Sequence, residues 1–156
     1  MRTICLAFIP IIGAVIGYLI SFRYLYAREF WDGFYNLNKK LKSEIRFTQN
    51  TLPNMIKTEN AKNAFIKALN EDLFDADLNA QKVKLYYLSE KEKEFYVNYV
   101  KTIGSTDKDA EIAFIDSVEQ ELYTYFRTHE EKYKKYRPLF IKLGFLFGLI
   151  MFILLV

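Results

Sequence analysis

One long segment, residues 106–156, changes from polar and periodic to almost purely apolar. Its first part, up to about Arg137, repeats apolar side chains on one helical face, whereas residues 139–156 carry a single charge, Lys142. A run of cations and tyrosines, residues 132–138, lies where the two parts meet, and this composition is typical of a helix that enters a membrane. We therefore expect this segment to hold the rest of the chain against a bilayer.

A second apolar stretch, residues 4–22, contains no charged side chain. At about 1.5 Å per residue it is long enough to cross roughly 30 Å of hydrocarbon. We expect an uncleaved transmembrane helix, with a cleaved signal peptide as the alternative. Cleavage is disfavoured because Leu19, Phe22 and Tyr24 are poor residues around a cut site near Ser21.

The chain is thus expected to have three parts: an N-terminal transmembrane helix over residues 1–23, a helical domain over 24–137 and a C-terminal transmembrane helix over 138–156. The cations beside both spans lie mainly on the side of the middle domain, and Arg2 is the exception. The positive-inside rule then predicts a two-pass protein of the cell (inner) membrane with a cytoplasmic domain. That domain is almost neutral, which argues against nucleic-acid binding.

The middle domain shows helical rather than strand periodicity. Apolar residues recur every three or four positions after the first span, at Phe30, Phe34, Leu37, Leu41 and Ile45. Shorter helices are expected over residues 60–74 and 78–88, and the pair Ser89 and Glu92 predicts a capping box that starts another. The predicted fold is an all-α helical bundle. Its long first and last helices run antiparallel and continue into the N- and C-terminal transmembrane helices.

Each span contains two glycines four residues apart, Gly13 with Gly17 and Gly144 with Gly148. This spacing places both glycines on one helix face and lets two backbones approach closely. The spans are predicted to pack through these glycines on each other or on the spans of a partner. The alternative is that glycine is simply common in membrane helices.

The sequence offers little for catalysis. There is no phosphate-binding loop, one cysteine (Cys5) and one histidine (His129). A zinc site needs three or four ligands, and a nucleophile needs a nearby base. Acidic pairs such as Glu119 and Glu121 are interpreted as solvated. We predict no catalytic, cofactor-binding or metal site, and no enzyme.

Three motifs, taken in order, resemble a known family. They are Glu44-Ile45-Arg46-Phe47 followed by Leu52-Pro53, the run 103–111 around Gly104, and Lys142-Leu143-Gly144 with Gly148. In each the chain is similar to the stage III sporulation protein AB family of endospore-forming bacteria. Asn50-Thr51 stands where that family usually has Thr-Pro.

The resemblance implies a non-enzymatic membrane scaffold of the secretion-like channel between mother cell and forespore. The family's helical domain is similar to the cytoplasmic domain of the type II secretion platform protein. By that likeness the expected partners are the mother-cell membrane and other sporulation channel components, including a secretion-type ATPase. A homo-oligomer is possible, because two spans in one copy cannot enclose a pore. A membrane-anchored helical sensor or regulator unrelated to sporulation is the alternative.

The candidate partner-binding residues are Glu44 and the corner made by Gly104, Thr106 and Asp107. A helix-capping corner presents backbone groups that a partner can bind. The alternative is that these residues only shape the ends of their helices.

Overall fold

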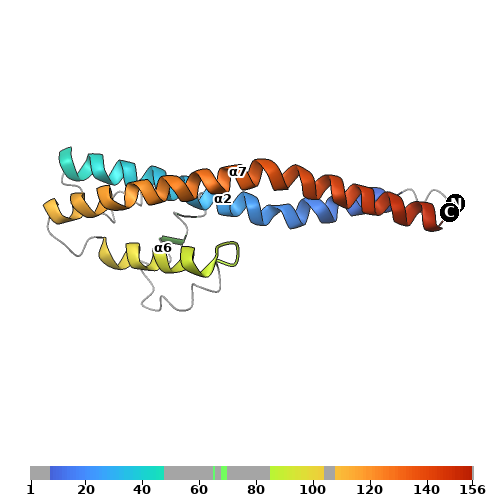
Figure 1. Ribbon diagram of the computed structural model, residues 1–156, viewed down its shortest axis with the longest axis horizontal. Coiled ribbons are helices and arrows are strands. Elements are labelled where there is room, and N and C mark those ends of the chain that lie inside the picture. Colours follow the sequence, from blue (N-terminus) through green and yellow to red (C-terminus); the bar gives the residue numbers. More distant parts are fainter. Residues whose placement is uncertain (1–7, 48–64, 66–67, 70–84, 104–107, 156) are drawn as a thin grey trace. The chain divides into compact units, whose positions relative to one another are not determined.

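A computed structural model describes residues 8–47, 65, 68–69, 85–103 and 108–155 of the chain (Figure 1). Its helices are α2 (Ile9–Phe47), α6 (Glu90–Thr102) and α7 (Lys108–Leu155). The described residues contain helices and turns and no strand. The predicted all-α fold with long first and last helices is therefore confirmed.

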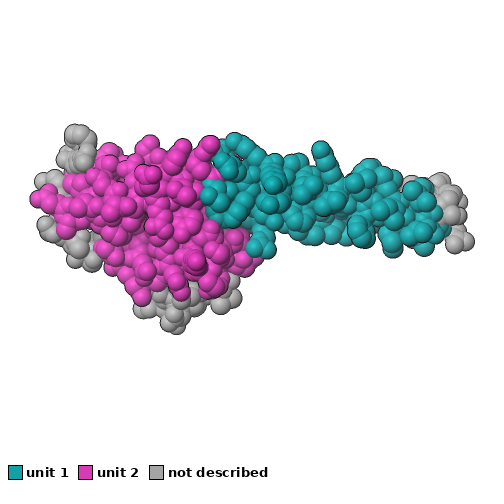
Figure 2. All heavy atoms as spheres, in the orientation of Figure 1, with its two compact units in different colours: residues 1–26, 128–156 teal, residues 27–127 magenta. Residues whose placement is uncertain are grey.

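The two long helices, of 39 and 48 residues, each contribute to two compact units. Unit 1 consists of residues 1–26 and 128–156, and unit 2 of residues 27–127 (Figure 2). Within unit 1, Gly13 meets Gly144 and Gly148 of α7. Within unit 2, Lys42 near the end of α2 meets Asp116 near the start of α7. Both sets of contacts show that α2 and α7 run antiparallel, as the sequence predicted.

The helices of unit 1 expose their apolar side chains instead of burying them. Phe147 is 71% exposed and Leu154 is 75% exposed on α7, and Leu19 is 58% exposed on α2. Helices that are apolar all round and unburied suit a lipid environment. α2 and α7 are both long and apolar enough to cross a membrane.

Unit 2 is built around an aromatic core. The rings of Phe34 and Phe65 stack with centroids 4.4 Å apart, and Trp31 stacks on Tyr125 at the same centroid distance. Phe30 packs edge-on against Tyr96 at 5.3 Å. Offset and edge-on contacts of this kind add to the stabilisation that burial of the rings provides. The apolar face predicted for α2 forms one wall of this core.

The capping box at the start of α6 is confirmed. The backbone N–H of Ser89 donates to Glu92 Oε2 at 2.6 Å, and its hydroxyl donates to the same oxygen at 2.7 Å. Ser89 itself is extended, with φ −74° and ψ 162°. Because the capping residue is extended, the chain in front of it leaves the helical path, and α6 begins at Glu90.

The end of one predicted helix is not helical. Residues 85–88, the last four of the predicted helix 78–88, form a turn closed by a 3.0 Å hydrogen bond from Leu88 N–H to Leu85 O. Residues 78–84 of that helix lie outside the described residues. Most of the predicted helix 60–74 lies outside the described residues. Phe65 and Leu69, which are described, are helical and buried.

α7 passes through Pro138 without ending. Proline removes one backbone donor and crowds the preceding turn, which costs about 3 kcal/mol in the interior of a soluble helix. Membrane helices tolerate proline better, because neighbouring groups satisfy the freed carbonyl. Pro138 lies in the cation- and tyrosine-rich run that precedes the apolar part of α7.

Candidate functional site: the paired apolar helices and the polar contacts of unit 2

The four glycines of the two spans lie together in unit 1. A Cβ atom added to Gly13 would collide with the carbonyl oxygen of Gly144 and lie 3.2 Å from the Cα of Gly148. A Cβ on Gly148 would lie 2.6 Å from the Cα of Pro10, and one on Gly17 would collide with the Phe140 carbonyl. Only glycine permits such contact between two helix backbones. The structure thus places all four residues in one contact between α2 and α7.

An apolar groove of about 460 Å³ opens beside this contact within unit 1. Isoleucines of α2 line one wall and large apolar residues of α7 line the other. The lining includes Ile12, Ile16, Ile20, Phe140, Leu143 and Phe147. The groove presents almost only carbon to its surroundings, so it suits an apolar chain rather than a polar ligand.

Cations and tyrosines of unit 1 interact where the apolar parts of the helices begin. The guanidinium of Arg137 lies 5.2 Å from the ring centre of Tyr133 and 5.7 Å from that of Tyr18, and it donates to the Tyr133 hydroxyl. Tyr24 of α2 stacks on Tyr136 and Phe140 of α7, with centroids 5.4 and 5.6 Å apart. The aromatic and basic belt seen in the sequence of α7 therefore includes α2 as well.

Asn38 is a polar residue in the core of unit 2. Its side chain is 0% exposed. The hydroxyl of Tyr99 donates to Asn38 Oδ1 at 2.9 Å, and Asn38 Nδ2 donates to the carbonyl of Ile115 at 3.4 Å. One amide thus joins α2, α6 and α7. A buried amide that is satisfied in only one arrangement fixes how helices align.

Lys42 forms an ionic contact between α2 and α7. Its Nζ lies 2.7 Å from Asp116 Oδ1 and 3.0 Å from Glu119 Oε2. The hydrogen bonds to Asp116 and then Glu119 raise the pKa of Lys42 above its ordinary value. The sequence interpretation of Glu119 as solvated was wrong, because its carboxylate binds Lys42. The sequence pattern gave no sign of this contact, since the two residues are 77 positions apart in the chain.

Two tyrosines of unit 2 have pKa values that burial raises. Burial raises the pKa of Tyr99, and Glu111 adds to the effect. Burial also raises the pKa of Tyr87, with a smaller contribution from Tyr86. A strongly perturbed pKa can mark a catalytic group, but Tyr99 is enclosed and already bonded to Asn38. It acts as a donor that holds helices together.

The predicted partner-binding residues fall in different parts of the chain. Glu44 is half-buried on α2 and belongs to unit 2. The contacts of Lys42 with Asp116 and Glu119 set the register, so Glu44 lies level with the first turns of α7. Gly104, Thr106 and Asp107 lie outside the described residues. Their role in binding stays a prediction.

His129 is buried on α7, in agreement with a packing role. In the part of the chain that the structure describes, no three His, Cys, Asp or Glu side chains are grouped to hold a metal ion. That the chain lacks catalytic, cofactor and metal sites stays a prediction.

Sequence reasoning missed Asn38, although a signal was present. Asn38 follows Phe34 by four residues and precedes Leu41 by three, so it lies on the predicted apolar face of α2. A lone asparagine on such a face is typical of a buried amide that sets helix register. Asp116 and Glu119 carried no comparable signal, because exposed acidic residues occur on most helices.

Comparison with known proteins gives one result. The family described as stage III sporulation protein AB matches residues 2–156, nearly the whole chain. Searches of curated proteins and of solved structures gave no significant match. With two helices able to cross a membrane, the chain is a membrane protein with a role in sporulation. This sequence belongs to the stage III sporulation protein AB family.

Proposed function

We propose that this protein is a non-enzymatic scaffold in the membrane of the mother cell, where it forms part of the secretion-like channel that connects mother cell and forespore. The family match over residues 2–156 carries the proposal, because it supports a role in sporulation. The two paired apolar helices support attachment to a membrane.

The packing of unit 2 favours a scaffold over an enzyme. Buried polar groups bind one another across its helices in the contacts of Asn38 with Tyr99 and Ile115. Its aromatic rings fill the interior, as in the stack of Phe34 and Phe65. Such a unit suits the presentation of a fixed surface to other proteins, and unit 1 provides its attachment to the bilayer.

The proposed partners are other channel components, among them a secretion-type ATPase, with unit 2 on the cytoplasmic side. A second copy of this chain is a further candidate partner. The proposed contact surface includes Glu44, which lies level with the first turns of α7, and the corner of Gly104, Thr106 and Asp107.

Affinity purification from sporulating cells tests the proposal. The full-length tagged protein is expected to recover the ATPase and other channel components when it is solubilised in mild detergent. Glu44→Arg is expected to reduce this recovery. Glu94→Arg is the matched control, because Glu94 is an exposed glutamate on α6.

Two results would contradict the proposal. If the intact protein recovers no channel component, the scaffold role is contradicted. If Glu44→Arg and Glu94→Arg both fold correctly and recover equal amounts of the channel components, Glu44 is not part of the contact surface.

A further inference from the structure

The net positive charge of this protein lies in unit 1. Residues 1–26 and 128–156 contain seven Lys and Arg and two Glu, whereas residues 27–127 contain 15 Lys and Arg and 17 Asp and Glu. Unit 1 is also the unit whose helices expose apolar side chains. A basic excess beside lipid-facing helices attracts anionic lipid headgroups.

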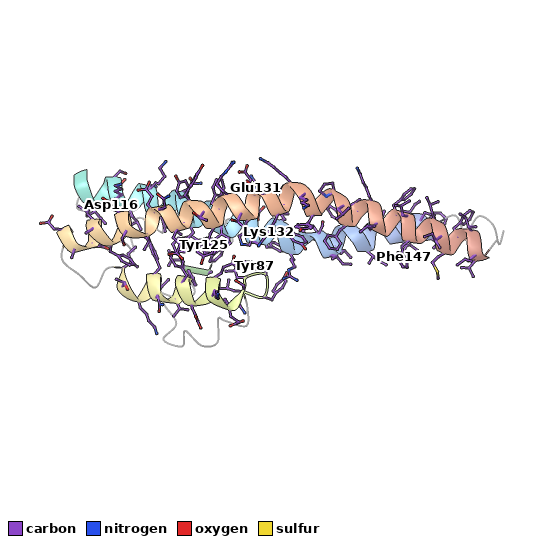
Figure 3. All side chains as sticks on the ribbon, viewed as in Figure 1. Tyr87, Asp116, Tyr125, Glu131, Lys132 and Phe147 are labelled. Carbon is purple, nitrogen blue, oxygen red and sulfur yellow. The ribbon has the colours of Figure 1, made fainter. Side chains whose placement is uncertain are left out.

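The groove of unit 1 leads towards two of these cations. On α2 its wall includes Ile16 and Ile20, and Arg23 follows them by seven and three residues, so it lies on the same helix face. On α7 the wall includes Leu143, and Lys132 precedes it by 11 residues, which is about three helical turns. Arg23 and Lys132 are both exposed (Figure 3 labels Lys132 and Phe147 on α7).

The antiparallel register places the two cations near each other along the helices. The stack of Tyr24 on Tyr136 puts Arg23 level with Tyr136, and Lys132 lies one turn before Tyr136 on α7. Two other exposed cations, Lys134 and Lys142, point away from this face of α7. At about 100° per residue, Lys134 lies about 200° around the helix from Lys132, and Lys142 lies about 100° from Leu143.

The lining of the groove favours a lipid chain over a further helix. Close helix docking in membranes relies on small residues. Here Gly13, Gly17, Gly144 and Gly148 are already used in the contact between α2 and α7. The remaining surface consists of isoleucine, leucine, phenylalanine and methionine, which fit a flexible acyl chain.

We propose that unit 1 binds an anionic phospholipid. One acyl chain lies in the groove beside the glycine contact, and the phosphate of the headgroup binds Arg23 and Lys132. The lipid would cover the junction of the two helices on one side. The inference requires only that both helices cross a bilayer, so it is independent of the proposed channel and partners.

Native mass spectrometry of the full-length protein tests this site. The protein is released from nanodiscs that contain equal amounts of phosphatidylglycerol and phosphatidylcholine, and the retained lipids are counted. We expect retention of phosphatidylglycerol in preference to phosphatidylcholine. In Arg23→Gln/Lys132→Gln the affinity should fall about 30-fold, because each cation near an anionic surface contributes about five-fold.

Two matched controls separate this site from general attraction. Lys134→Gln/Lys142→Gln removes the same charge from other faces of α7 and should change the affinity less than about three-fold. Ile16→Trp fills the groove and should displace the lipid, whereas Val15→Trp, on an equally exposed but different face, should not. All four positions face outwards or line the groove, so folding should persist.

Three results would overturn the proposal. Equal retention of the two lipids would show that the headgroup is not recognised. Equal losses in the two double variants would show attraction by overall charge alone. If Ile16→Trp separates a dimer of the chain and leaves phosphatidylglycerol retention unchanged, a helix of a second copy, rather than a lipid, occupies the groove.

Discussion

At the scale of single residues, unit 2 depends on a few polar contacts in an apolar interior. Asn38 accepts from Tyr99 and donates to the Ile115 carbonyl while its side chain is fully enclosed. A buried polar group that loses its partner pays its full desolvation cost, whereas the loss of both partners together costs less. The pair Asn38 and Tyr99 should therefore behave as one unit.

A double-mutant cycle at this pair tests that expectation. Asn38→Leu leaves the Tyr99 hydroxyl buried without its acceptor, and Tyr99→Phe removes the donor from Asn38. Each single change should lower the free energy of unfolding by about 1–3 kcal/mol. The double change should cost less than the sum, because no donor is left without an acceptor. Thermal unfolding of the full-length protein in detergent measures this, and additive losses would contradict it.

Alkaline pH should destabilise the folded protein through Tyr99. The pKa of Tyr99 is raised in the folded protein, so the folded state holds this proton at pH values where the unfolded chain releases it. The stability that this group contributes is fully present below about pH 10, the ordinary tyrosine pKa, and is lost as the pH rises beyond it. Tyrosinate absorbance should show exposed tyrosines ionising first and a later step that coincides with unfolding. Tyr99→Phe should reduce the amplitude of the later step, and an unchanged amplitude would contradict the assignment.

At the scale of helices, the contact of α2 with α7 in unit 1 depends on missing side chains. Backbone atoms of Gly13 and Gly144 approach so closely that any Cβ at either position collides with the opposite carbonyl. Backbone atoms cannot move aside as a flexible side chain can. A larger residue must therefore push the two helices apart.

Gly144→Ile tests this contact. We expect a loss of about 1–3 kcal/mol in the stability of the helix pair, because overpacking in a tight contact costs about that much. Leu146→Ile is the control, because Leu146 on the same helix is 53% exposed and makes no such contact. Thermal unfolding in detergent compares the two, and equal effects would show that the glycine contact does not stabilise the pair.

At the scale of the whole molecule, the open prediction is sidedness. The cations flank the spans on the side of the middle domain, and Arg2 is the exception. The positive-inside rule then places residues 24–137 in the cytoplasm, and these domain limits also stay predictions.

Cysteine labelling in intact cells tests this topology. In a Cys5→Ser background, Glu94→Cys on the exposed face of α6 should react with a membrane-impermeant maleimide only after the cells are permeabilised. A cysteine placed at Arg2 should react without permeabilisation. The reverse pattern would put the helical domain outside and would contradict the proposed contact with a cytoplasmic ATPase.

The sequence by itself determined features that depend on neighbours in the chain. The periodic face of α2, the capping box of Ser89 and Glu92 and the two apolar spans could all be predicted, because each arises from residues within a few turns of one another. The antiparallel course of the long helices followed from two spans that enter from the same side.

The tertiary structure decided which distant residues meet. Asn38 and Ile115 are 77 residues apart, as are Lys42 and Glu119, and their pairing depends on the register between α2 and α7. Likewise, the glycine spacing allowed contact with either the other span or a partner, and the fold places the four glycines against each other. Local pattern fixes helices, but a shift of one turn between them would change every partner across the interface.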